Sequence, residues 1–368
     1  MCSMGNPKSS LSTRAELHRI GSTANSSCYF RTTVREPYRK ALIQITERCN
    51  LHCAHCFVSA GNYGDAMSLD QIRHRVIPQL LAARVIRVTL TGGEPTVHPD
   101  FLNIVDAFSD AGLNTTICTN GLRHDAETIK RLLRSSRVRV NVSLDGFRKD
   151  SHGKFRGAPE SFAETVEGIR AFGDSGLLKG LLVTPNNFAS DEEYESIHEF
   201  AVACGAEFVL MNPLSPFGRG ARSTTFASTN ETMDHIRIAT NRFGTDIDLV
   251  RIRFPNRTET LQGCEAGTIF YVFTHGEVAV CPYLIFAAKN PISKHDPTEF
   301  IAGNIFTDDI AAALDTFPYA KRLAMGQNST CSSCHIVQSC GKGCPAAVIG
   351  RGLRVGELDS DVCPEVRQ

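Results

Sequence analysis

The sequence predicts an α/β fold in which a parallel sheet is curled into a partial or full barrel, followed by a cysteine-rich region. Between residues 41 and 213, six apolar runs of strand length alternate with five amphipathic segments of helical length. Such repetition is typical of parallel sheets with right-handed helical crossovers. After residue 222 the alternation breaks, and seven of the fourteen cysteines follow residue 260. The second half of the chain is therefore organised differently from the first.

The expected strands are rich in β-branched residues and span residues 41–46, 85–90, 114–119, 138–144, 177–184 and 208–213. The expected helices span residues 68–83, 101–111, 125–134, 161–172 and 191–204. The first helix has a clear start, because Ser68 is followed three residues later by Gln71, the pattern of a capping box. A further helix and a strand at residues 249–254 are expected beyond the break. In folds of this kind the active site lies at the carboxyl ends of the strands.

These patterns divide the chain into a polar N-terminal segment (residues 1–37), a barrel (38–222), a linker helix and strand (223–260) and a cysteine-rich domain (261–368). The 39 basic and 39 acidic residues balance, which argues against nucleic-acid and anionic-membrane partners. No apolar run reaches the length of a membrane-spanning helix, and residues 1–27 lack the apolar core of a signal peptide. Cysteines that must stay reduced to bind metal then predict a cytoplasmic protein.

Three cysteines stand close together directly after the first expected strand. Cys49, Cys53 and Cys56 form a C-x3-C-x2-C run within eight residues. Thiolates at this spacing converge on one soft metal centre. Three cysteines on a 4Fe–4S cluster leave one iron free to bind another ligand. A zinc site is the alternative, but structural zinc normally uses two paired cysteine knuckles.

Polar residues also follow the next three expected strands. Gly92-Gly93-Glu94-Pro95 follows the second strand, where the glycines would let a ligand approach the backbone and the carboxylate would accept from an ammonium group. Asn120 follows the third strand, and Ser143 and Asp145 lie at the end of the fourth, where they would bind ribose hydroxyls. Each motif alone is an ordinary turn signal. Their significance is that they share one rim with the cysteine run.

Together, the cysteine run and Gly92-Gly93-Glu94-Pro95 resemble the signature of the radical S-adenosylmethionine (radical SAM) enzymes, over about residues 38–215. The resemblance implies a partial (β/α)6 TIM-like barrel. It implies that Cys49, Cys53 and Cys56 bind a 4Fe–4S cluster and that the amino and carboxylate groups of SAM chelate its free iron. An external electron donor of the flavodoxin or ferredoxin type would then supply the electron that cleaves SAM. The resulting 5′-deoxyadenosyl radical abstracts hydrogen from a C–H bond.

The same resemblance assigns the residues of the rim to SAM. The segment Gly92–Glu94 would bind the methionine amino group, with Pro95 and Asn120 beside it. Ser143, Asp145 and Arg156 sit where members of the family contact the SAM carboxylate and ribose. The protein itself would bury the cluster from oxygen and water and aim the radical at one hydrogen.

The cysteines of the second half resemble the pattern of the SPASM extension, which implies two auxiliary 4Fe–4S clusters. The pattern runs from Cys264 through Gly276-x4-Cys281 and Cys331-x2-Cys334-x5-Cys340-x3-Cys344 to Cys363. By this resemblance the first auxiliary cluster is bound by Cys264, Cys281 and Cys344. The second is bound by Cys331, Cys334, Cys340 and Cys363. A zinc ribbon built on the last four closely spaced cysteines is the alternative.

Two positions depart from relatives that carry this extension. Thr258 stands where some relatives place a further cysteine, so the first auxiliary cluster is expected to have an open iron or a ligand such as Glu265 or His275. Pro282 and Tyr283 follow Cys281 where the sulfatase-maturing branch has an acidic base, which disfavours that activity.

Among the remaining candidates, Cys118 precedes the rim and is either a small buried residue or a thiol that delivers hydrogen to a substrate radical. Cys204 is expected in the core. His52 and His55 are expected to pack in the cysteine loop rather than bind metal, with His55 in the position of an aromatic that shields the cluster.

The sequence therefore predicts a radical SAM oxidoreductase or maturase that modifies a ribosomally synthesised peptide or another natural-product precursor. The alternative is a radical dehydrogenase, epimerase or decarboxylase acting on an antibiotic sugar, a nucleoside or a tetrapyrrole. Fewer than forty-five residues precede the first expected strand, so leader recognition by a separate chain, or a small-molecule substrate, is expected. An iron–sulfur electron carrier is the non-enzymatic alternative, but it would not need the SAM-binding rim.

Overall fold

The structure is a computed structural model that describes residues 27–29, 32, 34–256 and 258–366. Its centre is one ten-stranded sheet with the strand order β10-β9-β8-β1-β2-β3-β4-β5-β6-β7. All neighbouring strands from β8 through β1 to β7 are parallel, whereas β8, β9 and β10 pair antiparallel. The strands are β1 (Arg39–Thr46), β2 (Val85–Gly92), β3 (Asn114–Thr119), β4 (Val138–Ser143), β5 (Leu178–Val183), β6 (Phe208–Met211), β7 (Asp248–Arg251), β8 (Ile269–Val272), β9 (Glu277–Ala279) and β10 (Ile301–Asn304).

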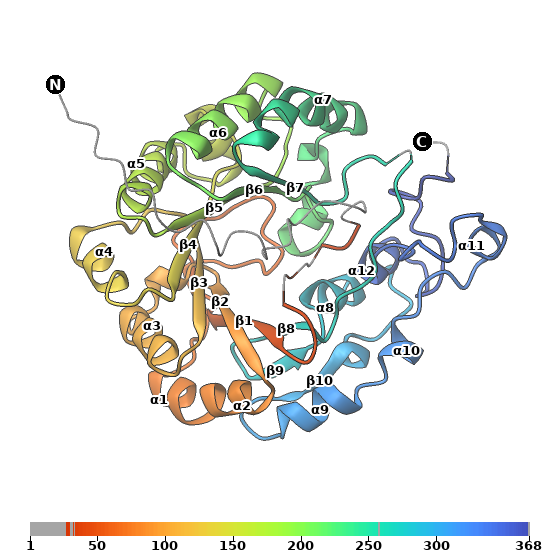
Figure 1. Cartoon of the computed structure of the whole chain (residues 1–368), viewed down its shortest axis with the longest axis horizontal. Coiled ribbons are helices and arrows are strands. Elements are labelled where there is room, and N and C mark those ends of the chain that lie inside the picture. Colours follow the sequence, from red (N-terminus) through yellow and green to blue (C-terminus); the bar gives the residue numbers. More distant parts are fainter. Residues whose placement is uncertain (1–26, 30–31, 33, 257, 367–368) are drawn as a thin grey trace.

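The sheet is curved, and its crossover helices cover the outer face (Figure 1). These helices are α1 (Leu69–Gln71), a π-helical turn η1 (Ile72–Val76), α2 (Ile77–Ala82), α3 (Phe101–Asp110), α4 (Ala126–Leu132), α5 (Ser161–Asp174) and α6 (Asp191–Ala203). The later helices are α7 (Asn230–Thr240), α8 (Pro282–Ala288), α9 (Ile310–Thr316), α10 (Tyr319–Arg322), α11 (Ser329–Ser333) and α12 (Pro345–Gly350). Short turns are η2 (Pro95–Val97), η3 (Lys149–Gly153), η4 (Gly218–Arg222), η5 (Thr224–Phe226), η6 (Asn241–Thr245) and η7 (Pro297–Phe300).

The α/β fold is confirmed, with the six predicted strands and the five helical segments between them. The Ser68 side chain accepts from the Gln71 amide at 3.1 Å, and the Gln71 side chain accepts from the Ser68 amide at 2.8 Å, which closes the predicted capping box. The helix that begins there contains the π-helical turn η1, which the 3.6-residue periodicity did not indicate.

The barrel sheet is larger than the six predicted strands. The strand expected at residues 249–254 is β7, which pairs parallel with β6, and β8 pairs parallel with β1 at the other edge. The domain boundary expected at residue 260 thus marks a change in the sequence pattern. The sheet itself contains strands from both sides of this boundary, because β8 pairs with β1.

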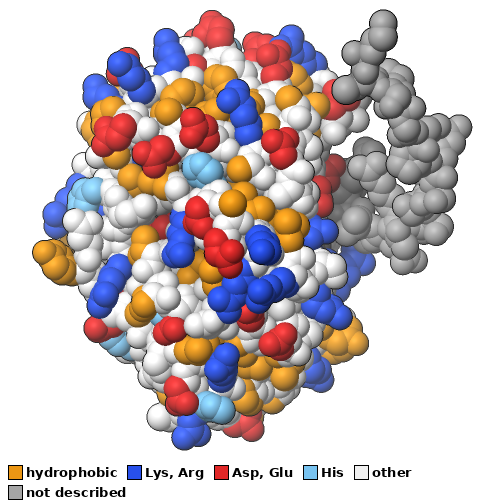
Figure 2. Space-filling model, turned by 90° about the vertical axis from the view of Figure 1, so that its left-hand side faces the viewer, with side chains coloured by type: hydrophobic (Ala, Val, Ile, Leu, Met, Phe, Trp, Pro, Cys, Tyr) orange, Lys and Arg blue, Asp and Glu red, His pale blue; other side chains and the backbone are white. Residues whose placement is uncertain are grey.

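The hydrophobic core lies between the sheet and its outer helices. Helix α3 shows the principle, because Phe101, Ile104, Val105 and Phe108 are all buried and recur at helical spacing on one face. This packing fixes the directions of the strands, so that their carboxyl ends form one rim. In Figure 2, acidic and basic side chains are interspersed over the face shown, as the balanced composition requires. Among the helices of the described residues, none is both long and apolar enough to cross a membrane.

Candidate active site and metal centres

The cysteine loop leaves the carboxyl end of β1 and folds back on itself. The amide of Cys49 donates to the carbonyl of Gly61 at 2.7 Å, which ties the start of the loop to its end. Burial raises the pKa of the Cys49 thiol to about 12 and that of Cys53 to about 11. Buried thiols of this kind become thiolates when a cation binds beside them, and binding then releases their protons.

The two glycines after β2 pack against this loop. The amide of Gly93 donates to the carbonyl of Thr46 at 2.9 Å. A Cβ atom at Gly92, which has a φ of +149°, would lie 2.2 Å from the Thr46 carbonyl oxygen, and one at Gly93 would lie 2.2 Å from that of Arg48. The expectation that these glycines make room for a ligand is therefore corrected in part. The group that approaches their backbone is the chain's own cysteine loop, and the glycines set the position of that loop.

Glu94 lies at the centre of the rim and is 2% exposed. One carboxylate oxygen accepts from the hydroxyls of Thr96 and Thr119, each at 2.7 Å, and from the Thr96 amide at 3.1 Å. The other oxygen accepts from the amide of Asn120 at 2.8 Å. Burial raises the pKa of Glu94, although these hydrogen bonds oppose the shift. A cation beside the carboxylate would favour its charged form.

Asn120 and Pro95 connect this carboxylate to the surrounding elements. The side chain of Asn120 donates to the side chain of Asn50 at 2.8 Å, so the end of β3 contacts the cysteine loop directly. Pro95 is the buried first residue of the turn η2, which Glu94 caps. The predicted residues of β2 and β3 therefore come together as one unit around Glu94.

A second unit forms at the end of β4. The Asp145 carboxylate, 1% exposed, accepts from Arg156 Nε at 2.8 Å and from the Thr184 amide at 2.7 Å. Burial alone would raise the pKa of Asp145, but the Arg156 guanidinium and the hydrogen bond from the Thr184 amide lower it below the ordinary value. Both oxygens are thus engaged by the protein, and Asp145 fixes the position of the Arg156 side chain. Ser143 is the last residue of β4 and is half-buried.

The His55 ring lies flat against Phe155, with the ring centroids 4.5 Å apart and the planes inclined by 17°. The backbone of the same segment holds the loop, because the Ala54 amide donates to the Phe155 carbonyl at 2.9 Å. Burial lowers the pKa of His55 to about 4, so its imidazole is neutral at pH 7. The stacking agrees with the expectation that His55 packs in the loop. His52 is exposed.

Arg219 is a residue of this site that the sequence did not indicate. It lies in the turn η4 beyond β6, and its guanidinium donates to the carbonyls of Cys53 at 2.9 Å and Ala60 at 2.5 Å. Its amide donates to the carbonyl of Cys56 at 3.0 Å. Arg219 therefore fixes the part of the loop from Cys53 to Ala60, whereas the glycines contact its start at Thr46 and Arg48. No motif surrounds it, so only the fold reveals the role.

Cys118 occupies β3 next to the rim. Its sulfur accepts from the Asn141 side chain at 3.9 Å, and burial raises the pKa of the thiol while Lys40 opposes the shift. Lys40 and Asn141 lie on β1 and β4, so this thiol is surrounded by polar groups of neighbouring strands. Cys204 caps the end of helix α6 and is half-buried.

In the C-terminal part, four of the predicted metal ligands line one cavity. These are Cys331, Cys334, Cys340 and Cys363. Burial raises the pKa of Cys363, and the neighbouring thiols of Cys331 and Cys340 raise it further. Four cysteine sulfurs around a single cavity are the donor set of a 4Fe–4S cluster or of a tetrahedral zinc site.

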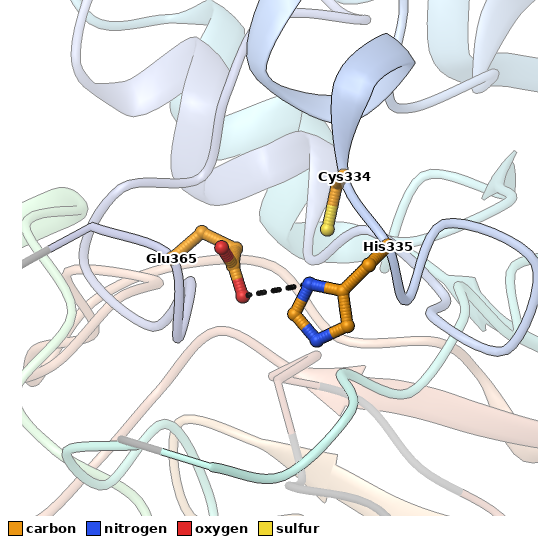
Figure 3. A group of neighbouring side chains, drawn as sticks. All are labelled: Cys334, His335 and Glu365. Atoms are coloured by element: carbon orange, nitrogen blue, oxygen red, sulfur yellow. Dashed lines mark ion pairs between the residues drawn. The ribbon is translucent and has the colours of Figure 1, made fainter.

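Cys334 also belongs to a mixed group at the surface, shown in Figure 3. Its sulfur lies within 4.8 Å of a ring nitrogen of His335 and a carboxylate oxygen of Glu365. His335 Nδ1 and Glu365 Oε1 are 3.8 Å apart, and the His335 side chain is 77% exposed. Cys334 could therefore bind a metal ion together with His335 and Glu365 instead of with the other three cysteines. Analysis of the bound metal will distinguish these two sets of ligands.

The other three predicted cysteines, Cys264, Cys281 and Cys344, line a second cavity. The fourth cysteine in this cavity is Cys28, to which the sequence gave no role. Of the alternatives expected for the missing ligand, His275 does not line this cavity and lies instead in an exposed cluster with Glu47 and Asp65. Glu265 lines the cavity but accepts from the Thr32 amide at 2.7 Å and the Gln262 side chain at 3.1 Å.

Three stacked aromatic rings connect this second cavity to the cysteine loop. The Tyr29 ring stacks on Tyr283, with centroids 4.7 Å apart and planes inclined by 16°. Tyr283 in turn stacks on Phe57 at 5.3 Å and 26°. Tyr29 follows Cys28 and Phe57 follows Cys56, so a continuous stack of three rings runs from one cysteine group to the other.

Comparison with known proteins agrees with this geometry. The sequence model of the Radical SAM superfamily matches residues 43–201. Mycofactocin maturase MftC of Mycobacterium ulcerans is 30% identical over 332 residues, covering 86% of each chain. The chain therefore belongs to the radical SAM superfamily and is an enzyme of that class.

Other relatives cover a similar range. The subtilosin biosynthesis protein AlbA of Bacillus subtilis is 27% identical over 297 residues, covering 78% of this chain and 61% of AlbA. The crystal structure of Streptococcus suis SuiB bound to its precursor peptide SuiA superimposes with a TM-score of 0.67 at 18% identity, covering 88% of this chain and 76% of SuiB. The latter likeness shows that the fold is shared.

Superfamily membership implies one 4Fe–4S cluster and SAM. The residues of the rim fit this pair of cofactors, because three thiols lie on one loop and the carboxylate of Glu94 is buried beside it. Bound there, the cluster supplies the electron that cleaves SAM. The protein's own part is to hold the loop between the Gly92–Gly93 segment and Arg219, and to place Glu94 at the end of β2.

Proposed function

We propose that this enzyme uses SAM to abstract hydrogen from a C–H bond of a ribosomally synthesised peptide, and so acts as a peptide maturase. The observation that carries the proposal is the cysteine loop at the strand ends, held against Glu94 and Asn120. The relatives that cover most of the chain point to the substrate class. One relative is a mycofactocin maturase, AlbA is a biosynthesis protein of the bacteriocin subtilosin, and SuiB has been crystallised with a precursor peptide.

The proposal includes three 4Fe–4S clusters, one on the loop and two in a C-terminal SPASM-type region. Two observations support the auxiliary clusters. Seven predicted cysteines divide between two cavities, and the division follows the expected assignment of ligands to the two clusters.

Cys118 remains a candidate hydrogen donor, because it lies on β3 one residue before Thr119, which binds Glu94. A low-potential flavodoxin or ferredoxin in the cytoplasm would supply electrons.

The function is tested by incubating the anaerobically reconstituted protein with SAM, dithionite and synthetic peptides encoded beside its gene. We expect 5′-deoxyadenosine and methionine to form, and the peptide mass to change in the same reaction. With a peptide deuterated at the reacting carbon, deuterium should appear in 5′-deoxyadenosine. Turnover of SAM without any change in an encoded peptide, together with turnover of a small molecule, would contradict the peptide assignment. Cys204→Ala is the matched control, because it removes a thiol outside the site.

A separate prediction concerns Glu94. Glu94→Gln keeps the shape of the side chain and retains an acceptor for the two threonine hydroxyls, but it removes the negative charge beside the SAM ammonium group. We expect SAM affinity measured by calorimetry to fall by about 1–3 kcal/mol, the value of a charge-assisted hydrogen bond, while iron content stays the same. Asp125→Asn, which changes the capping carboxylate of helix α4, is the control. Unchanged SAM affinity in Glu94→Gln would show that Glu94 only shapes the turn.

A further inference from the structure

The cavity near helices α8 and α12 contains an unusual group of thiols. Cys281 precedes α8 and Cys344 precedes α12, and both are buried, as is Cys28 from the other end of the chain. Cys264 completes the group and is exposed. All four sulfurs are free thiols that line the same cavity. Sulfur is a weak hydrogen-bond donor and acceptor, so four such groups are better satisfied by a soft metal centre than by one another.

Cys28 is in direct contact with its neighbours. Its side chain is 4% exposed, and its sulfur lies 3.6 Å from the carbonyl oxygen of Gly263 and 3.7 Å from that of Gly343. Those glycines immediately precede Cys264 and Cys344. Cys28, Cys264 and Cys344 also line the same cavity. The Cys28 side chain therefore lies directly beside the two segments that carry Cys264 and Cys344.

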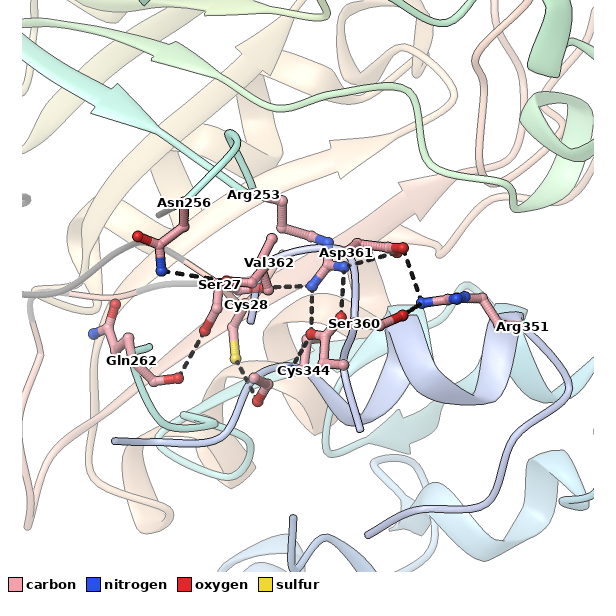
Figure 4. A network of polar contacts seen from close by, with 12 residues as sticks. Ser27, Cys28, Arg253, Asn256, Gln262, Cys344, Arg351, Ser360, Asp361 and Val362 are labelled. Carbon is pink, nitrogen blue, oxygen red and sulfur yellow. Dashed lines mark hydrogen bonds and ion pairs between the residues drawn. The ribbon is translucent and has the colours of Figure 1, made fainter. Parts of the chain in front are cut away.

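The backbone around Cys28 is held in place by interactions on both sides of the residue (Figure 4). On one side, the Ser27 hydroxyl donates to the carbonyl of Gln262 at 2.7 Å, and Arg253 donates to the carbonyl of Ser27 at 2.9 Å. On the other side, the ring of Tyr29 stacks on Tyr283. The residues 27–29 are thus bound to the C-terminal part of the chain on both sides of the cysteine.

The competing ligands for this position are less well placed. His275 lies in the exposed cluster with Glu47 and Asp65. The two oxygens of Glu265 accept hydrogen bonds from Gln262 and Thr32. Thr258 offers a hydroxyl, which is not a ligand that iron–sulfur clusters normally use. Among the described residues that line the cavity, Cys28 is the one that adds a thiol to the three that the sequence pattern provides.

We infer that Cys28 is the fourth thiolate ligand of the first auxiliary cluster, together with Cys264, Cys281 and Cys344. The inference rests on the proposed SPASM-type function, because it assigns a ligand to a cluster which that function requires. Of the two alternatives that the sequence left open for this site, it favours a closed cluster over an open iron. With four protein thiolates, each iron of the cluster is already bound, so no iron is left for a substrate atom.

The test uses the full chain with Cys49, Cys53 and Cys56 replaced by alanine, so that only auxiliary clusters remain. After anaerobic reconstitution we expect about eight irons, and we expect an electron paramagnetic resonance spectrum that does not respond to added imidazole or 2-mercaptoethanol. Adding Cys28→Ala should remove about one iron on mild oxidation, produce a three-iron signal, and make the spectrum respond to both ligands. Cys28→Ser, which preserves size and fold, should retain iron but shift the spectrum.

Cys204→Ala in the same background is the control and should change nothing. Spectra of Cys28→Ser and Cys28→Ala identical to that of the background would overturn the assignment of Cys28. So would a response to added thiol while Cys28 is still present. If instead the background itself binds zinc, or fewer than about eight irons, the auxiliary clusters of the proposed function fail, whichever residue stands at position 28.

Discussion

Replacement of Cys49, Cys53 and Cys56 with alanine is expected to remove about four of about twelve irons and to abolish SAM cleavage. The loss is selective because these three thiols lie on one loop at the end of β1, whereas the other cysteine groups lie in separate cavities. Iron and sulfide analysis after anaerobic reconstitution measures the first effect. Quantitation of 5′-deoxyadenosine under dithionite measures the second.

The matched control is Cys118→Ala together with Cys204→Ala, which removes two thiols that belong to none of the three groups. Its iron content should equal that of the unchanged protein. Zinc in place of iron, or the loss of all iron from the triple variant, would show that the groups are not independent iron–sulfur sites.

The largest effect on stability is expected from Arg253→Met. Arg253 donates two hydrogen bonds to Asp359, at 2.7 and 2.9 Å, and their side chains are 4% and 1% exposed. Burial alone would lower the pKa of Arg253, but Asp359 holds it well above the ordinary value, so the guanidinium stays charged. Removing the guanidinium leaves a buried carboxylate without its partner, which costs about 3–5 kcal/mol.

Thermal unfolding of the reconstituted protein, followed by circular dichroism under argon, measures this loss as a lower midpoint. Arg351→Met is the control, because Arg351 pairs with Asp361 at 2.8 Å where the side chains are 40% and 53% exposed. Exposed pairs contribute at most about 1 kcal/mol, so this midpoint should hardly move. Equal shifts in the two variants would mean that burial of the Arg253–Asp359 pair is unimportant.

Much of the barrel could be predicted from sequence because its signals are local. Each strand is a short apolar run, and α3 shows its buried face through residues three and four positions apart. The capping box at Ser68 is equally local. The cysteine loop was predictable for the same reason, since its three ligands occupy eight consecutive residues.

The features that were missed depend on contacts between distant parts of the chain. Arg219 reaches Cys53 across 166 positions, and no neighbouring residue indicates its role. The expected role of Gly92 was to admit a ligand, but only the path of the loop shows that Thr46 occupies that space. Similarly, the spacing of Cys264 to Cys363 defines two sets of ligands but carries no information about residues near the start of the chain.

The docking of residues 27–29 also sets an order for biosynthesis. Cys28 leaves the ribosome 235 residues before Gly263 and 315 residues before Gly343, the two carbonyl partners of its thiol. The cysteine loop, in contrast, is complete within eight residues. A scaffold that delivers iron and sulfide can therefore meet the loop's three thiols while translation is still under way. The group of thiols around Cys28 can form only after nearly the whole chain has been made. Iron and sulfide can therefore be inserted at this site only when synthesis of the chain is almost complete.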